Sequence, residues 1–289
     1  MKNDPELNYW AVAFIDLLGQ NAKLAQMTHL PTSQEETEHF KGLFQETFAA
    51  INDLYESFES NFEKLSYKNT SIELPPDISE EQFAKLRTGK VSFQRFSDGL
   101  VAFVSLKNTN DILPMNGISA LIGTLGILFP AFLAKRIPLR CGVDVGIGME
   151  MNPNELYGPA VRNAYHMESR IAQYPRIVLG KEIMSYMSDY IPKMPDGTHE
   201  VSLSKVLAKH WLDRCIKDVD GYPILNYLGH HFLTDVHGKE IDRYIYEEAL
   251  KFIIAELNQH KANQDTKLAF RYVLLHDYFQ YHRKNWLGN

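Results

Sequence analysis

Two short segments of the sequence each place one aspartate at the end of an apolar run. Asp16 follows Phe14-Ile15 and precedes a glycine-containing turn, and Asp98 lies in Phe96-Ser97-Asp98-Gly99, ahead of a second apolar run. If the two runs are neighbouring strands, both carboxylates point at the same place. Two carboxylates at one place suit two hard divalent cations, with a polyphosphate as the remaining ligand. The structural alternative is that each aspartate caps a helix or forms a turn.

Strands must position these aspartates, and the pattern of apolar residues predicts where the strands lie. Residues 9–15 are a predicted buried strand. Residues 91–96 and 100–106 are a predicted hairpin with Ser97-Asp98-Gly99 at its turn. Residues 137–148 alternate between apolar and small or polar types, which predicts a further strand that ends at its last glycines.

Helices are predicted between these strands. A helix begins near Gly19, and residues 33–64 form one or two amphipathic helices with Ser33 and Glu36 as a capping box. Residues 118–134 are almost entirely apolar but short for a bilayer span, so we expect a helix buried against the sheet. Residues 158–173 form a helix with proline at its first position.

The remaining pattern completes an α+β arrangement. The order of strand, helix, strand, strand, helix, strand, helix and strand predicts a ferredoxin-like fold, a mainly antiparallel sheet with helices on one face. We expect a catalytic domain over residues 1–232, with a polar insertion at about 65–90, and a C-terminal helical extension over 233–289. The later elements are predicted as a strand at 176–179, a helix at 181–190, a hairpin of 214–217 with 223–228, and helices at 240–259 and 266–284.

Composition excludes several classes of partner. The 289 residues carry a net charge of -6 and no basic stripe, which argues against nucleic-acid and anionic-membrane binding. The two cysteines, Cys141 and Cys215, have no metal-ligand spacing, and the N-terminus has no signal-peptide pattern. We therefore expect reduced cysteines and a cytoplasmic location.

Four spaced segments resemble the motifs of class III nucleotidyl cyclases over roughly residues 7–230. Within that family the chain is most similar to the Pycsar anti-phage cyclases, which make cyclic pyrimidine mononucleotides. The cues for this subgroup are residues 164–169 and 174–178 and the turn Asp218-Val219-Asp220-Gly221. The four family segments, in the family's order, are Phe14-Ile15-Asp16 with Gly19, Phe96-Ser97-Asp98, Leu139 to Gly146, and Leu156 to Val161.

The resemblance implies conversion of UTP to 3′,5′-cyclic UMP and pyrophosphate in anti-phage defence, with two Mn²⁺ or Mg²⁺ ions. Asp16 and Asp98 would hold the ions together with the backbone carbonyl of Leu17. Backbone N–H groups from Leu18 to Asn21, Gly19 included, would bind the phosphates at a helix start. The resemblance also implies a homodimer with shared active sites and a separate effector protein that responds to the cyclic nucleotide.

Several positions depart from the family pattern. Gln94 stands where ATP-specific cyclases carry lysine, and Glu155 stands where they carry aspartate. Glutamine both donates and accepts hydrogen bonds, so it could pair with uracil or cytosine. Arg162 and His166 occupy the places of the family's asparagine and arginine, and could stabilise the phosphate or form a solvated helix face. Lys217 precedes a hairpin turn where the family keeps a phosphate-binding lysine.

Other functions remain open at this level. The chain could be a cytidylate cyclase that makes cyclic CMP, or an adenylate or guanylate cyclase with unusual base contacts. It could also be a degenerate module that binds a nucleotide without turnover. The retained Asp16 and Asp98 favour an active enzyme, whereas the missing asparagine and arginine favour a degenerate module.

Overall fold

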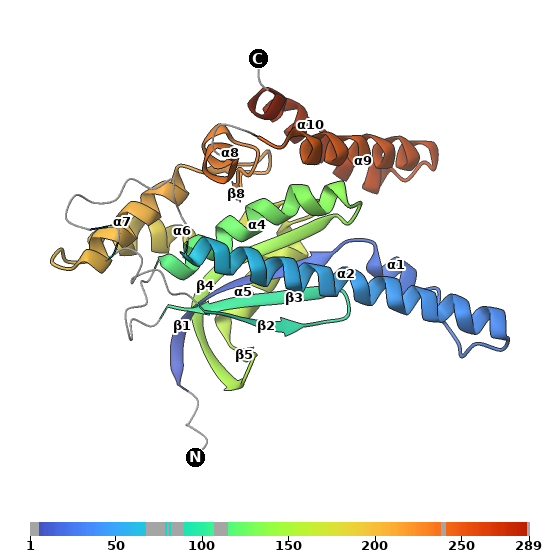
Figure 1. Ribbon diagram of the computed structural model, residues 1–289, viewed down its shortest axis with the longest axis horizontal. Helices are drawn as coiled ribbons and strands as arrows, with labels where there is room; N and C mark the ends of the chain where they lie inside the picture. The colour runs from blue at the N-terminus through green and yellow to red at the C-terminus, as the bar shows by residue number, and fades with distance from the viewer. Residues whose placement is uncertain are drawn as a thin grey trace.

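One twisted sheet organises the molecule (Figure 1). The computed structural model describes residues 6–67, 79, 81, 90–106, 115–237 and 241–287, so most of the predicted insertion at about 65–90 lies outside the described residues. The sheet runs in the order β2-β3-β1-β4-β6-β8-β7, with β5 paired to β4. Its strands are β1 (Leu7–Leu17), β2 (Val91–Arg95), β3 (Gly99–Ser105), β4 (Leu139–Asn152), β5 (Glu155–Tyr157), β6 (Ile177–Leu179), β7 (Cys215–Lys217) and β8 (Pro223–Leu225).

The sheet is antiparallel except where β4 meets β6. That parallel pair needs a crossover, which α5 (Pro159–His166) and a π-helical turn (Met167–Ile171) supply. The mainly antiparallel α+β architecture predicted from the sequence is therefore confirmed.

The main helical layer covers one face of the sheet. It contains α2 (Gln34–Tyr67) and α4 (Asn116–Ala134), and α9 (Arg243–Ala262) packs on α4. Helix α4 is long and apolar enough to cross a membrane, but 83% of its most apolar window is buried inside the fold. It is the buried core helix that the sequence predicts.

The C-terminal helices belong to the same apolar core. Side chains of α9 and of α10 (Thr266–Leu287) join the cluster that also holds the inner residues of β1, β3 and β4. Tyr278 of α10 donates a hydrogen bond to Asn226 beside β8 (3.0 Å between oxygens), and Asn285 donates to the Leu228 carbonyl. The predicted division at residue 232 is not a break in packing.

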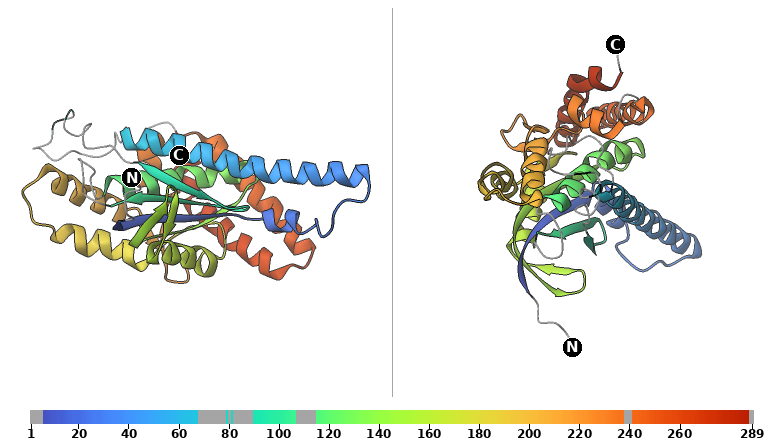
Figure 2. Two further views of the ribbon diagram at one scale, coloured as in Figure 1. Left: turned by 90° about the horizontal axis from the view of Figure 1, so that it is seen from below. Right: turned by 60° about the vertical axis from the view of Figure 1, so that its left-hand side comes forward.

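The opposite face, at β1 and β4, is covered by α5 together with the π-helical turn that follows it. Figure 2 (left) shows the sheet between α2 on one side and the yellow-green α5 on the other. The close approach of α5 to the sheet depends on glycines of β4. A Cβ at Gly142 would collide with the backbone of residues 164–168, and one at Gly146 would lie 3.1 Å from Ala160. Three of the four alternate residues on this face of β4 lack a side chain, and this leaves room for a helix. The four residues are Gly142, Asp144, Gly146 and Gly148.

The structure corrects several predicted boundaries. Strand β4 does not end at its glycines but continues to Asn152, because β5 pairs with its far end. The predicted helix over 158–173 changes to a π-helical turn after His166. The helix near Gly19 is only α1 (Gln20–Leu24), and the sequence pattern missed both α7 (His199–Leu212) and α8 (His230–His237).

Candidate active site

The strand pairing brings Asp16 and Asp98 together. Asp16 is opposite Gly99 in the antiparallel register of β1 and β3, and Asp98 is the residue before Gly99. The Leu17 N–H donates a hydrogen bond to the Asp98 carbonyl (2.8 Å) and closes the sheet at this end. The predicted neighbourhood of the two aspartates is confirmed. Negative charge on Asp98 also helps to raise the pKa of Asp16, though burial is the larger cause.

Arg140 lies beside Asp16 on the next strand. The two residues are opposite each other in the register of β1 and β4, and Arg140 Nε donates to Asp16 Oδ2 at 2.9 Å. The same Nε lies 2.6 Å from Oε1 of Glu168, which sits in the π-helical turn after α5. One guanidinium therefore bridges a strand carboxylate and a helix carboxylate.

Sequence reasoning did not identify Arg140 and Glu168 as site residues. Both occur within family-like segments, but neither carries a local signal for a role. The available signal was strand alternation, because Arg140 is two residues before Gly142 and so shares its sheet face. The position of Glu168 next to Arg140 depends on the contact of Gly142 with residues 164–168, which is a tertiary contact.

Burial makes this cluster electrostatically unusual. The Glu168 side chain is 2% exposed, and burial raises its pKa to about 7. Arg140 opposes that rise, whereas Asp16 and Asp98 add to it. The cluster thus combines three carboxyl groups with one guanidinium, and a further cation at Asp16 and Asp98 would relieve the repulsion.

The donor set fits a hard divalent cation. Asp16, Asp98 and the Leu17 carbonyl offer oxygen ligands only, which Mg²⁺ and Mn²⁺ prefer to nitrogen or sulfur. Within the described part of the chain, no group of three or more His, Cys, Asp or Glu side chains has a geometry that could hold a metal ion. The residues therefore suit an ion that takes its other ligands from water and substrate phosphates, as Mg²⁺ commonly does.

The loop after β1 only partly matches the predicted phosphate cradle. The Leu18 N–H donates to the Pro138 carbonyl at 2.9 Å, so it is already used within the sheet. Helix α1 has five residues, which is too short for a strong helix dipole. Gly19 has φ of 91°, a conformation that favours glycine. Phosphate binding here would depend on the exposed turn at Gly19, not on Leu18.

The two predicted base-reading residues do not contact each other. Gln94 is opposite Val101 and faces the α5 side of the sheet, as Asp16 does. The Glu155 carboxylate is exposed and accepts a hydrogen bond from the Asn152 side chain at 2.6 Å. Phe14 of β1 contacts both Phe96 and Tyr165, the latter on α5.

The predicted phosphate-stabilising residues lie on two different elements of the fold. Arg162 and His166 are exposed on α5. Lys217 is exposed on the edge strand β7, four strand positions from β1, which corresponds to about 19 Å across a sheet. Arg176 forms ion pairs with Asp218 and Asp220 and so fixes the turn after Lys217.

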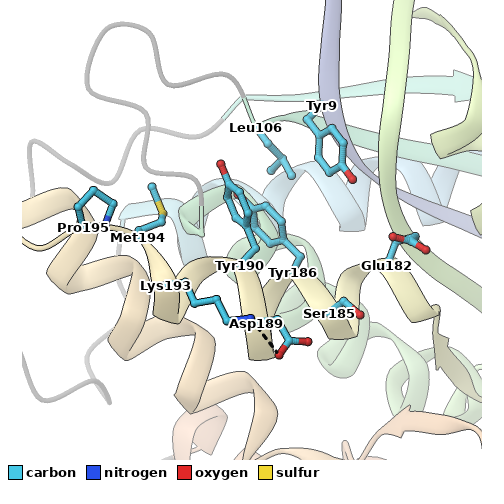
Figure 3. A pocket seen from close by; sticks show the side chains of 10 residues that line it. All are labelled: Tyr9, Leu106, Glu182, Ser185, Tyr186, Asp189, Tyr190, Lys193, Met194 and Pro195. Carbon is cyan, nitrogen blue, oxygen red and sulfur yellow. Dashed lines mark ion pairs between the residues drawn. The ribbon is translucent and has the colours of Figure 1, made fainter.

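Two other features of the fold have structural or separate roles. Asp144 accepts hydrogen bonds from the Val145 and Ile183 N–H groups, and burial raises its pKa to about 6. A pocket of about 820 Å³ lies at the opposite end of β1, where Tyr9 stacks with Tyr186 (Figure 3). That pocket holds none of the predicted site residues.

Comparison with known proteins finds similarity only at the level of the backbone. No family model matches the sequence, and no curated protein matches it. The monomeric guanylyl cyclase domain of the RhoGC fusion protein from the aquatic fungus Blastocladiella emersonii is 12% identical, with a TM-score of 0.43 over 77% of this chain and 96% of that one.

Two further solved structures show the same level of similarity. The catalytic core of a rhodopsin-guanylyl cyclase with converted specificity, in complex with ATPalphaS, has a TM-score of 0.42 at 13% identity, over 65% of this chain and 85% of that one. The adenylyl cyclase CyaB from P. aeruginosa has a TM-score of 0.39 at 12% identity, over 77% and 94%.

Proposed function

We propose that this protein is a metal-dependent nucleotide cyclase that converts UTP to 3′,5′-cyclic UMP and pyrophosphate. One observation carries the proposal. The register of β1 and β3 brings Asp16 and Asp98 to the same end of the sheet, beside a glycine turn that is open to solvent. Paired carboxylates with few other protein ligands suit cations that bind together with a polyphosphate.

The chain's own residues would act mainly by positioning and charge. When bound, two divalent ions lower the pKa of the attacking ribose 3′-hydroxyl and neutralise charge on the triphosphate. Asp16, Asp98 and the Leu17 carbonyl would hold them, and the turn at Gly19 would contact phosphate. The 3′-hydroxyl forms a bond to the α-phosphorus as the bond to pyrophosphate breaks, and the hydroxyl proton passes to solvent.

The proposal includes a homodimer, which the positions of the other predicted residues support. Arg162 and His166 are exposed on α5, and Lys217 is at the far edge of the sheet. A second copy of the chain, docked on the α5 side, would bring these cations to the aspartates of its partner and would make two equivalent sites. The effector that responds to the product is a separate protein in this proposal.

The preference for UTP over the other ribonucleoside triphosphates is the most specific part of the proposal. Gln94 lies on the same face as Asp16, and no lysine occupies its position to read adenine. A glutamine amide can pair with the uracil edge, and a glutamate carboxylate can accept from uracil N3–H. A buried polar group left unpaired by the wrong base costs about 1–3 kcal/mol, which corresponds to roughly tenfold or more discrimination.

The test is incubation of the purified protein with Mn²⁺ and an equal mixture of the four ribonucleoside triphosphates, with products identified by mass. We expect cyclic UMP first and cyclic CMP second. Cyclic AMP or cyclic GMP as the main product would overturn the base assignment and leave a cyclase. No cyclic product would favour a degenerate nucleotide-binding module.

Two isosteric variants connect the activity to the site. Asp16→Asn and Asp98→Asn should each lower turnover about a hundredfold or more, because each removes a charged cation ligand. The control is Asp213→Asn, an exposed aspartate at the end of α7, which should keep wild-type turnover. Normal product from either site variant would contradict the two-ion proposal.

A further inference from the structure

Arg140 is shared between two carboxylates that come from different parts of the fold. Its Nε hydrogen-bonds Asp16 Oδ2 on β1 at 2.9 Å and lies 2.6 Å from Glu168 Oε1 after α5. All three side chains are largely withdrawn from solvent, at 15% exposed for Asp16, 21% for Arg140 and 2% for Glu168. The interaction is therefore only weakly screened by water.

The position of Arg140 creates a competition. A guanidinium that pairs with Asp16 alone would occupy the carboxylate that the proposed cation needs. Glu168 attracts the same guanidinium, and its Oε1 lies closer to Nε than the Asp16 carboxylate does. With Glu168 ionised, the cluster of Asp16, Asp98, Glu168 and Arg140 has a net charge of about -2, which matches one divalent ion; without that charge it would be about -1.

We propose that Glu168 is a positioning residue for the Asp16–Asp98 cation site, and that it shares Arg140 with Asp16 so that the Asp16 carboxylate remains able to bind a divalent ion. This inference rests on the proposed function, because it needs a cation at Asp16. Glu168 itself contacts Arg140 and not the cation.

The seating of Glu168 supports a specific role. Its backbone N–H lies so close over Gly142 that any side chain there would collide with it. The turn that carries it is π-helical, a form that is rare and frequent at functional sites. A fold that only needed to bury this surface could use an apolar side chain here, without the cost of desolvating a carboxylate.

The experiment measures Mn²⁺ binding directly, by the loss of the free-ion electron paramagnetic resonance signal, without nucleotide and at a pH above the Glu168 pKa of about 7. The variants are Asp16→Asn, Glu168→Gln, and the double variant Arg140→Gln with Glu168→Gln. The double variant keeps the net charge of the cluster and removes the competing guanidinium. Circular dichroism melts confirm that each variant is folded.

We expect Glu168→Gln to weaken Mn²⁺ binding about tenfold, because one nearby negative charge is lost and Arg140 turns wholly to Asp16. The double variant should return to within about threefold of wild type. Unchanged binding in Glu168→Gln, or a double variant as weak as the single one, would overturn the inference. If Glu168→Gln does not fold, Glu168→Asp serves instead, with an expected loss of several-fold and unchanged binding as the overturning result.

Failure of the proposed function would look different. Asp16→Asn should abolish the Mn²⁺ binding seen in the wild type. If Asp16→Asn binds as the wild type does, the cation site is not at Asp16, and both the proposed function and this inference are wrong. If Asp16→Asn loses binding and Glu168→Gln does not, only the role of Glu168 is wrong.

Discussion

Substitution of Gly142 by alanine should push α5 away from the sheet and lower the stability of the protein. Gly142 is opposite Phe14 in the register of β1 and β4, on the face that α5 covers. The three atoms nearest to a Cβ there would be the Ala164 carbonyl oxygen, the Glu168 nitrogen and Met167 Cβ. Two of these are backbone atoms, so no side-chain rotation can relieve the overlap.

The size of the effect follows from those contacts. Even the most distant of the three, Met167 Cβ, would lie at 2.6 Å, whereas ordinary contacts begin at 3.4 Å. The helix must therefore move outward by about 1 Å, which breaks close packing along α5. Overpacking of this kind costs about 1–3 kcal/mol, and displacement of Glu168 from Arg140 adds to it. We expect a loss of about 3 kcal/mol in the free energy of unfolding.

Urea denaturation followed by circular dichroism measures that loss, with two glycine variants as matched controls. Gly146→Ala places Cβ 3.1 Å from Ala160 and should cost about 1 kcal/mol. Gly42→Ala lies in α2 with nothing within 4 Å, so it should stabilise by about 0.5–1 kcal/mol through better helix propensity. The expected order of stability is Gly42→Ala, wild type, Gly146→Ala, Gly142→Ala.

The outcome that refutes this reasoning is a Gly142→Ala protein as stable as the wild type. That result would mean that α5 does not sit against β4 as described, and the contact between Arg140 and Glu168 would lose its support. A Gly146→Ala variant that is less stable than Gly142→Ala would also contradict the order of contacts.

Two further predictions concern the assembly and the buried carboxyl groups. A mixture of Asp16→Ala and Arg162→Ala chains should recover about a quarter of wild-type turnover, because half the dimers are mixed and each mixed dimer has one intact site of two. A mixture of Arg162→Ala and Lys217→Ala chains should recover no turnover, because one chain supplies both residues to a site. Recovery in that second mixture would mean that the two residues come from different chains. Burial raises the pKa of Glu168 from 4.5 to about 7, so the folded state binds the extra proton. Its contribution to stability is therefore complete below pH 4.5 and is lost as pH rises through 7, by up to about 3 kcal/mol. Glu168→Gln should flatten that part of the pH profile in urea titrations, and parallel profiles for both proteins would contradict the assignment.

Local sequence pattern determined the elements that carry the aspartates. Ser97-Asp98-Gly99 is a turn between two apolar runs, and the two strands of such a hairpin pair with each other because they are adjacent in the chain. The same is true of the start of α2, where the Glu36 N–H donates to Ser33 Oγ at 3.1 Å as the capping box predicts. The apolar run at 118–134 determined a buried helix, since burial is the stable place for such a surface.

Only the tertiary structure decided what surrounds those aspartates. Arg140 and Glu168 are 124 and 152 residues from Asp16 in the sequence, and they meet it through the register of β4 and the seating of α5. A shift of one residue in that register would turn Arg140 to the other face of the sheet. The extension of β4 to Asn152 and the separation of Lys217 from β1 likewise depend on long-range pairing. Periodicity reports which face a residue prefers, but contacts between distant segments depend on packing, so they are set when the whole chain folds.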